Sequence, residues 1–191
     1  MTTKRDTDTL ILDAFADLIT HYGYKSTTTK KIAEAAGVNE ITIFRHFKDK
    51  AHLLDALISQ YMETVGELED QFKISGDIVA DLTWIAKTYA EFVANHRAIF
   101  TILMERNADI SDNISDQVKR LPQKYRDGLI TVLTQMQENG EVNSSVNVKV
   151  EATNFMFMNF GRISVRLSGS LELSEEQFIS QNVTEFANHI K

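Results

Sequence analysis

Apolar residues recur every three or four positions along most of this chain, which is the spacing of one face of an α-helix. The first run covers residues 10–22 and stops at Gly23. Later runs predict further helices over residues 28–36, 40–47, 50–76, 78–92, 100–104, 122–140, 148–168 and 174–190. The polar stretch 109–117 predicts a loop. Strand-like alternation is absent from the sequence, so the pattern predicts an all-α chain of about nine helices.

Residues 27–50, TTTKKIAEAAGVNEITIFRHFKDK, predict two helices joined by a glycine turn. The hydroxyl of Thr28 can cap the first helix and the side chain of Asn39 the second, because both side chains accept hydrogen bonds from free backbone N–H groups. Gly37 stands where a helix ends in a left-handed residue, and Asp49 is a plausible cap for the next helix. This pattern is typical of a helix-turn-helix that enters the DNA major groove. An ordinary corner between two helices is the alternative interpretation.

The second helix of this pair has two kinds of side chain. Its apolar side is expected to consist of Ile41, Ile43, Phe44 and Phe47. The residues expected to face outward are Glu40, Thr42, Arg45 and His46.

The predicted helix over 148–168 is apolar in almost every direction, and a helix of that kind must be buried all round. One subunit of this size hardly achieves that burial. The pattern therefore favours a homodimer in which this helix and the helix over 174–190 contact a partner subunit, against the alternative of a core within one chain. The residues expected at the interface are Phe155, Ile163, Ile179, Val183, Phe186 and Ile190.

Composition and charge narrow the class of protein. Cysteine is absent from the 191 residues, which excludes disulfides, thiol nucleophiles and thiolate metal sites. The N-terminus lacks the apolar core of a secretory signal, and no run reaches the roughly 18 apolar residues of a membrane span, so a cytoplasmic location without membrane contact is expected. The net charge of −7 is uneven, with +1 in residues 1–50 and −8 in residues 51–191. An acidic body is repelled by phosphate, which discourages DNA from binding in the wrong orientation.

Catalytic and metal-binding motifs are missing from the sequence. It contains no HExxH, P-loop or GxGxxG pattern. We therefore expect no enzyme activity, no cofactor and no metal. The functions that remain open are a DNA-binding regulator, an adaptor of the same fold that binds protein, and a helical enzyme of unrecognised type.

Taken together, residues 10–58 resemble the TetR family of bacterial transcriptional regulators. The segment ILDAFADLITHYGYKSTTTKKIAEAAGVNEITIFRHFKDKAHLL is similar to the family's pattern of G-[YF], T-T, I-A-x-x-A-G-V, T-[LI]-[YF]-x-[HY]-F and K-x-x-L. The resemblance implies a helix-turn-helix domain over 1–50 and a ligand-binding and dimerisation domain over 51–191. It also implies a regulator, usually a repressor, that a small effector releases from a palindromic operator.

The family's DNA-contacting positions correspond here to Thr28, Thr29, Asn39, Glu40, Ile41, Thr42, Phe44, Arg45, His46 and Lys50. Their chemistry suggests two groups. Hydroxyl, histidine and lysine side chains suit phosphates, which applies to Thr28, Thr29, His46 and Lys50. Side chains that suit base edges are Arg45 and Thr42.

Three of these positions carry open questions. Glu40 could accept a hydrogen bond from cytosine or could discourage wrong sequences. Phe44 stands where many family members have tyrosine, so it either belongs to the core or packs on a sugar. Ile41 could contact a thymine methyl group.

An effector cavity is the last expectation. Aromatic and methionine side chains suit an apolar or amphipathic ligand, although such residues often belong only to the core. The candidates are Trp84, Tyr89, Phe92, Phe100, Met104, Phe155 and Met158. Possible polar anchors are Glu91, Glu105 and Arg162, for each of which a surface position is the alternative.

Overall fold

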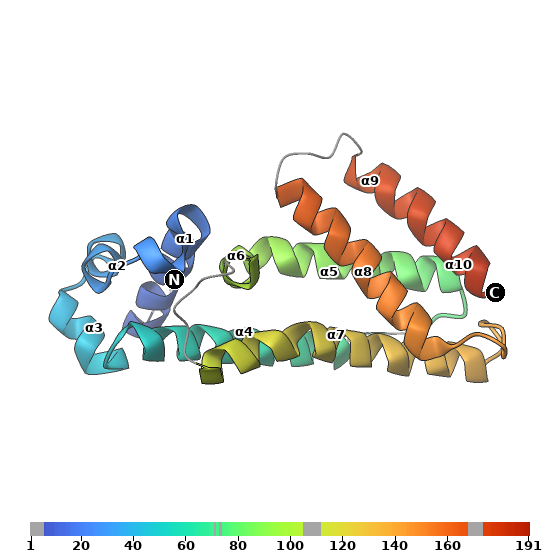
Figure 1. Ribbon diagram of the computed structural model, residues 1–191, viewed down its shortest axis with the longest axis horizontal. Coiled ribbons are helices and arrows are strands. Elements are labelled where there is room, and N and C mark those ends of the chain that lie inside the picture. Colours follow the sequence, from blue (N-terminus) through green and yellow to red (C-terminus); the bar gives the residue numbers. More distant parts are fainter. Residues whose placement is uncertain (1–5, 71, 73, 105–111, 168–173) are drawn as a thin grey trace, which may run out of the picture. The chain divides into compact units, whose positions relative to one another are not determined.

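The computed structural model describes residues 6–70, 72, 74–104, 112–167 and 174–191, and all secondary structure in these ranges is helical (Figure 1). The helices α9, η1 and α10 follow one another without a break, so the described part contains nine helical stretches. The prediction of an all-α fold is confirmed. The elements are α1 (Thr7–Ser26), α2 (Thr29–Ala36), α3 (Glu40–Phe47), α4 (Lys50–Asp70), α5 (Ile78–Asn95), α6 (Arg97–Met104), α7 (Asp112–Glu138), α8 (Val148–Leu167), α9 (Glu175–Phe178), η1 (Ile179–Val183) and α10 (Thr184–Ile190).

Helix ends are set by local hydrogen bonds that the sequence predicts. The Thr28 hydroxyl accepts from the backbone N–H of Lys31 at 3.3 Å, and Asn39 Oδ1 accepts from that of Ile41 at 2.9 Å. Gly37 ends α2 with φ of 67°, a left-handed conformation that costs glycine little. Asp49 Oδ1 likewise accepts from the backbone N–H of His52 at 2.9 Å at the start of α4.

The start of α7 differs from the prediction. The expected loop 109–117 is helical from Asp112, and Pro122 lies inside α7 rather than near its beginning. Residues 109–111 lie outside the described ranges. The apolar residues Ile114, Val118 and Leu121 recur at helical spacing, a pattern that the polar composition of this stretch had obscured. Composition alone was therefore a poor guide here.

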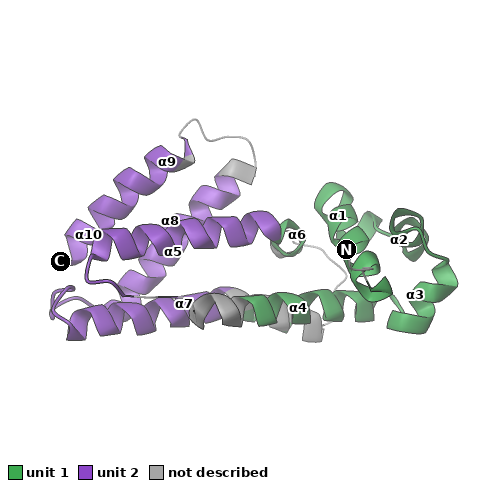
Figure 2. Ribbon diagram, turned by 180° about the vertical axis from the view of Figure 1, so that it is seen from behind, with its two compact units in different colours: residues 1–64, 96–121 green, residues 65–95, 122–191 purple. Residues whose placement is uncertain are grey.

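The chain divides into two compact units, formed by residues 1–64 with 96–121 and by residues 65–95 with 122–191 (Figure 2). These units are not the predicted division at residue 50, because each contains two segments of the chain and α4 contributes to both. The units describe packing rather than function, so the functional division at residue 50 stays a prediction.

Unit 1 is built on α1, which packs against α2 and α6, while α2 packs against α3. Gly23 interrupts α1 with φ of 77°, and the chain then turns toward α2. The core of this unit is mostly aliphatic and also contains aromatic rings. Its fully buried side chains include Ile11, Phe15, Ile19, Ile32, Ile43, Leu53, Leu54 and Ile58.

In unit 2, α5 packs against α8, η1 and α10. The residues expected at a dimer interface lie in this core instead. Phe155, Ile163, Ile179, Val183 and Ile190 are buried within the single chain, and the half-buried Phe186 ring lies 5.0 Å from that of Phe155. Phe186 and Phe178 of the C-terminal helical stretch lie against Phe155 and Arg162 of α8 within the same chain. The five buried side chains therefore belong to the core of the chain, and the dimer contact expected of the whole set stays a prediction.

No helix in the described part of the chain is both long enough and apolar enough to cross a bilayer.

Candidate DNA-binding surface

The helices α2 and α3 are held together from inside by apolar contacts and from outside by one hydrogen bond. Ile32, Ala33 and Ile43 are buried where the two helices meet. Thr29 Oγ1 donates to Glu40 Oε1 at 2.7 Å, which joins the first residues of both helices. Glu40 therefore has a structural partner that the sequence analysis did not foresee, and Thr29 shares its hydroxyl with that carboxylate.

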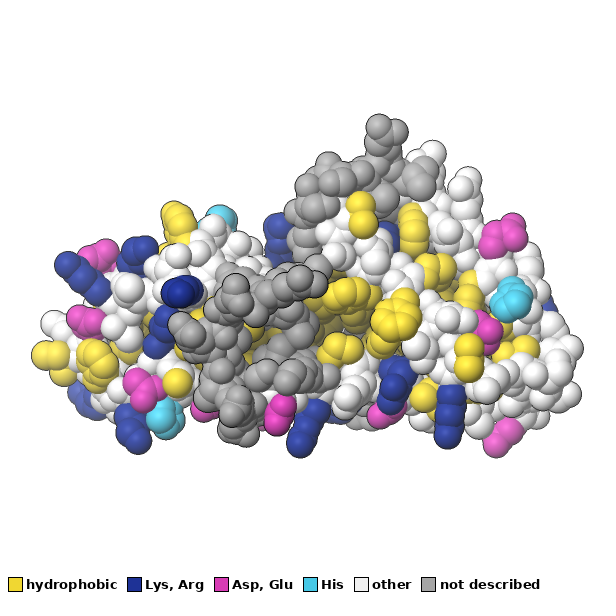
Figure 3. Space-filling view, in the orientation of Figure 1, with side chains coloured by type: hydrophobic (Ala, Val, Ile, Leu, Met, Phe, Trp, Pro, Cys, Tyr) yellow, Lys and Arg dark blue, Asp and Glu magenta, His cyan; other side chains and the backbone are white. Residues whose placement is uncertain are grey.

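The outer face of α3 carries apolar as well as polar side chains. Ile41 is 73% exposed and Phe44 49% exposed, so the expectation that both belong to the inner side is wrong. Only Ile43 of the predicted apolar set is fully buried, with Phe47 half-buried, because α2 covers one side of this short helix. Ile41, Phe44 and the exposed Arg45 follow one another at helical spacing and share a face. Figure 3 shows hydrophobic side chains over α3 beside lysine or arginine.

His46 ties α3 to the start of α1. Its Nδ1 forms a hydrogen bond with the carboxylate of Asp8, and its Nε2 lies 3.3 Å from Nη2 of Arg45. The imidazole thus stands between a carboxylate and a guanidinium at the surface. This arrangement orients Arg45, while a contact of His46 with phosphate stays a prediction.

Lys50 has a structural role that the sequence analysis missed. Its ammonium group donates to the carbonyl oxygens of Tyr24 and Thr27, both at 3.0 Å, and lies 4.1 Å from the centroid of the Tyr24 ring. Burial raises the pKa of the Tyr24 phenol, and the nearby carboxylates of Asp49 and Asp55 raise it further, so Tyr24 stays neutral beneath the cation. Lys50 therefore fastens the start of α4 to the end of α1, the two elements that flank the helix-turn-helix.

Several exposed cations surround the helix-turn-helix. Lys31 Nζ donates to the carbonyl of Ser26 at 2.9 Å. Positive charge near a groove-binding helix attracts phosphate without reading sequence. In the sequence these cations were visible only as part of the net charge of residues 1–50, although their positions surround the helix-turn-helix. They are Lys25, Lys30, Lys31 and Lys48.

The expected effector residues are divided between the two compact units. Phe100 is buried in unit 1 and its ring lies 6.4 Å from that of Tyr61. In unit 2, Trp84 is 40% exposed and its ring centroid lies 6.0 Å from that of Phe72, whereas Tyr89 is buried. The others in unit 2 are the buried Phe92 and Phe155 and the half-buried Met158. The side chain of Met104 lies outside what the structure describes.

Two surface clefts of unit 2 are lined by other residues. The first lies between Gly76–Ile78, the turn at Gly140 and Glu141, and the terminal Lys191. The second lies along α7 between Lys124 and Gln135 and includes Phe72. Neither cleft is lined by the residues that the sequence predicts to bind the effector. Effector binding by those residues stays a prediction.

A group of buried polar residues in unit 2 includes one of the possible polar anchors. Arg162 of α8 is 3% exposed, which excludes the alternative of a surface position, and Asn159 of the same helix is 0% exposed. Tyr125 of α7 is buried and stacks on Tyr89 of α5 with ring centroids 4.0 Å apart. The signal that could have found this group is the pair Asn159 and Arg162, three residues apart among apolar neighbours on α8.

Comparisons with known proteins place the chain among bacterial regulators. A sequence model described as "Bacterial regulatory proteins, tetR family" matches residues 11–57. The HTH-type transcriptional regulator YvkB of Bacillus subtilis is 37% identical over 85% of this chain and 84% of the relative. The fatty acid metabolism regulator protein of the same organism is 28% identical over 78% of each chain. The regulatory protein TetR from Rhodobacter sphaeroides has a similar fold, with a TM-score of 0.75, 21% identity and coverage of 97% and 99%.

Proposed function

Because the chain belongs to the TetR family and is a DNA-binding transcriptional regulator, we propose that it binds a palindromic operator as a homodimer and represses transcription until a small effector releases it. The observation that carries this proposal is the exposed face of α3. Ile41, Phe44 and Arg45 project from a short helix whose other side is anchored by Ile43. Major-groove recognition needs a rigid helix whose exposed face carries both apolar and polar side chains.

The proposed contacts divide by chemistry. Arg45 and the half-buried Thr42 contact base edges, and Ile41 meets the methyl group of a thymine. Thr28 and Lys50 contact phosphates at the rim, where the free N–H groups at the start of α2 also point. Phe44 packs against a sugar, since its exposed ring carries no hydroxyl for a phosphate.

The homodimer is proposed to form through a face of α8 that the chain leaves uncovered. Val150 is 49% exposed, Phe157 60% and Val165 37%, and Gly161 lies open between the last two. These positions are seven, four and four residues apart, which places them along one side of the helix. Figure 3 shows hydrophobic side chains gathered along α8. A glycine in such a face lets a second helix approach closely, so we propose that two copies of α8 pack across it.

The proposed effector is apolar or amphipathic and binds in the C-terminal domain. One relative is named as a regulator of fatty acid metabolism, which supports a ligand with a hydrophobic part. A ligand shifts operator binding only by its different affinity for the bound and released states, and a coupling of about 1–3 kcal/mol would be typical.

A gel shift with the DNA upstream of the protein's own gene tests DNA binding directly. We expect one retarded complex that survives competition by unrelated DNA and disappears with a competitor of the same sequence. The matched control is the Arg45→Ala, Thr42→Ala double variant, which alters two base-facing positions and leaves the core intact. If the wild type and this variant bind the upstream DNA and unrelated DNA equally, sequence-specific binding through α3 is refuted. If neither DNA is retarded, the adaptor hypothesis is favoured.

A further inference from the structure

The interior of unit 2 contains a polar cluster that packing alone does not require. It consists of Tyr89 on α5, Tyr125 on α7, and Asn159 and Arg162 on α8, all of them buried. Asn159 and Arg162 are three residues apart and therefore share the buried side of α8. The exposed side of the same helix carries Phe157 and Gly161, so the two sides have separate roles.

Two side-chain oxygens of this cluster lack hydrogen bonds. Among the residues that the structure describes, Tyr125 Oη and Asn159 Oδ1 have no hydrogen-bond partner. Asn159 Nδ2 donates to the carbonyl of Phe155 at 2.9 Å, which fixes the amide so that its oxygen is the open group. Protein interiors rarely leave buried polar atoms unsatisfied, because each one loses its hydration without compensation. A bound molecule that donates to Asn159 and accepts from Tyr125 would restore both interactions.

Arg162 adds a permanent positive charge to this place. Its guanidinium carbon lies 5.3 Å from the centroid of the Phe178 ring, and its charge reaches the phenol of Tyr125. Burial raises the pKa of Tyr125, the neighbouring Tyr89 raises it further, and Arg162 lowers it. The tyrosine is thus a neutral hydroxyl that can donate a hydrogen bond beside a cation. A planar guanidinium is well suited to a carboxylate.

The surroundings of the cluster are apolar and locally irregular. Phe155, one turn before Asn159, packs on Phe186, and the Phe178 ring lies against Arg162. Directly after Phe178 the helix changes to the wider π form over Ile179–Val183, which packs against α5. Such segments are frequent at functional sites.

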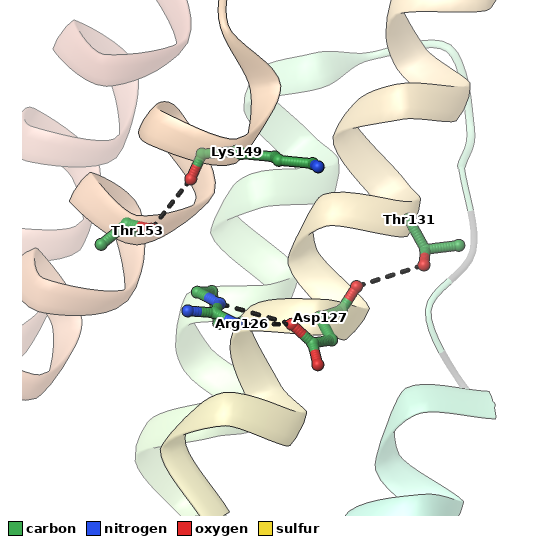
Figure 4. A network of polar contacts seen from close by, with 5 residues as sticks. All are labelled: Arg126, Asp127, Thr131, Lys149 and Thr153. Carbon is green, nitrogen blue, oxygen red and sulfur yellow. Dashed lines mark hydrogen bonds and ion pairs between the residues drawn. The ribbon is translucent and has the colours of Figure 1, made fainter.

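On their outer surfaces, by contrast, α7 and α8 carry polar contacts of the usual kind. Arg126 donates to the neighbouring Asp127, the Thr131 hydroxyl donates to the Asp127 carbonyl, and that of Thr153 to the Lys149 carbonyl (Figure 4). Each of these contacts joins two residues of one helix. The buried cluster differs because its open groups come from both helices.

We propose that this cluster is the recognition site for a small carboxylic acid with an apolar body and a hydroxyl or N–H group beside the acid. Arg162 and Tyr125 hold the acid group, Asn159 Oδ1 accepts from the neighbouring donor, and the rings of Phe155 and Phe178 contact the apolar body. The inference rests on the proposed function only in one respect, that the acid bound here is the effector that releases the operator.

Binding is measured first without DNA, by calorimetry on the full chain. The probes are 2-hydroxydecanoate, decanoate and decan-1-ol. Each is compared with the homologues that have six and sixteen carbon atoms. We expect the hydroxy acid to bind most tightly, the simple acid more weakly and the alcohol weakest. Arg162→Met should weaken binding of both acids by roughly tenfold or more and leave the alcohol unchanged, because a charge-assisted bond is lost. Asn159→Leu should remove only the advantage of the hydroxy acid.

Tyr125→Phe separates this role from a structural one. It removes a hydroxyl that has no partner among the described residues, so thermal stability should stay the same or rise while acid binding weakens several-fold. The control is Tyr61→Phe, an equally buried tyrosine of unit 1, which should leave acid binding unchanged. Binding of acid and alcohol with equal affinity at every chain length would overturn the proposal. A lack of acid binding would overturn it too, and would mean that the cluster holds buried water or is satisfied within the chain.

A gel shift with the operator then distinguishes this inference from the proposed function. If the wild type binds operator and the hydroxy acid releases it, whereas Arg162→Met binds operator but resists release, both stand. If the acid binds but leaves the operator complex intact, the site is present and its role as effector site is overturned. If no acid binds while the operator complex forms, the inference fails and the DNA-binding function remains.

Discussion

At the scale of single residues, Lys50 has a position that serves two purposes. Its ammonium group donates to two carbonyls at the end of α1 and lies over the ring of Tyr24. These contacts link α1 to α4, and the phosphate contact that the family resemblance implies is proposed for the same side chain.

We predict that Lys50→Met lowers both stability and DNA affinity. Loss of the charged hydrogen bonds and of the cation–π contact should reduce the free energy of unfolding by about 1–3 kcal/mol. The slope of log K against log salt should flatten by about one unit for each half-site. Thermal denaturation and salt-dependent binding check the two effects. The control is Lys30→Met, which removes an exposed lysine of α2 and should change stability by less than about 0.5 kcal/mol. Unchanged stability in Lys50→Met would refute the structural role.

Arg45 is predicted to contribute to sequence preference. It is exposed on the recognition face and lies beside His46, which orients it. Arg45→Ala should cost about 1–3 kcal/mol for each half-site and relax the preference at one base position. Binding to a set of operators with single base changes measures this. Lys48→Ala on the same surface should instead weaken binding equally for all sequences. A uniform loss with Arg45→Ala would assign Arg45 to a phosphate.

At the scale of elements, α8 separates its functions by direction. One side holds Phe155, Asn159 and Arg162 inside unit 2, and the opposite side presents Phe157 and Gly161 to solvent. Its composition is apolar in nearly every direction because one side serves the core of the chain and the other is proposed to serve a partner. Dimerisation through α8 therefore remains the proposal, even though five of the six interface residues first expected are buried in the core.

We predict that substitutions on the exposed side of α8 separate dimerisation from folding. Gly161→Leu should leave stability equal or higher, because a glycine inside a helix costs about 1 kcal/mol and a side chain here meets open space. It should also prevent two helices from approaching, as should Phe157→Glu. Analytical ultracentrifugation and circular dichroism give the two measurements. The control is Thr131→Glu at an exposed position of α7, and this variant should remain a dimer. In contrast, Phe155→Glu places a charge in the core and should unfold unit 2. If Gly161→Leu and Phe157→Glu both dimerise like the wild type, the proposed interface is wrong.

At the scale of the whole molecule, charge and symmetry determine how the protein meets DNA. Residues 1–50 carry a net charge of +1 and residues 51–191 carry a net charge of −8. Residues 51–191 therefore repel phosphate, and residues 1–50, which contain the helix-turn-helix, do not. A twofold symmetric dimer would present two copies of α3, and its operator would have the same symmetry.

The spacing of the operator half-sites tests this symmetry. We predict that inserting about five base pairs at the centre of the palindrome, half a helical turn, abolishes high-affinity binding, because the second α3 then faces the wrong side of the duplex. Inserting a full turn of about ten base pairs should restore part of the affinity if the two helix-turn-helix domains of the dimer can move apart. Footprinting on both altered operators measures the occupancy of each half-site. Equal affinity for one half-site and for the intact palindrome would contradict a dimeric mode of binding.

The sequence by itself determined the local architecture. Thr28, Gly37 and Asn39 predict the ends of α2 and α3, and the structure shows the hydrogen bonds of both caps. These features depend on hydrogen bonds between residues close in the chain, and so periodicity and caps suffice to find them. The family of the chain was visible in the same segment for the same reason.

Only the tertiary structure decided what each helix side faces. Ile41 and Phe44 belong to the surface and Arg162 to the interior, which reverses the order expected from polarity. Burial depends on which neighbouring helix covers a residue, and that neighbour can be far away in sequence, as the C-terminal stretch is from α5. A helix such as α8, apolar in almost every direction, contains no period from which its covered side can be inferred. The position of Lys50 against the end of α1 likewise required the packed structure, because the carbonyls it binds precede it by 23 and 26 residues.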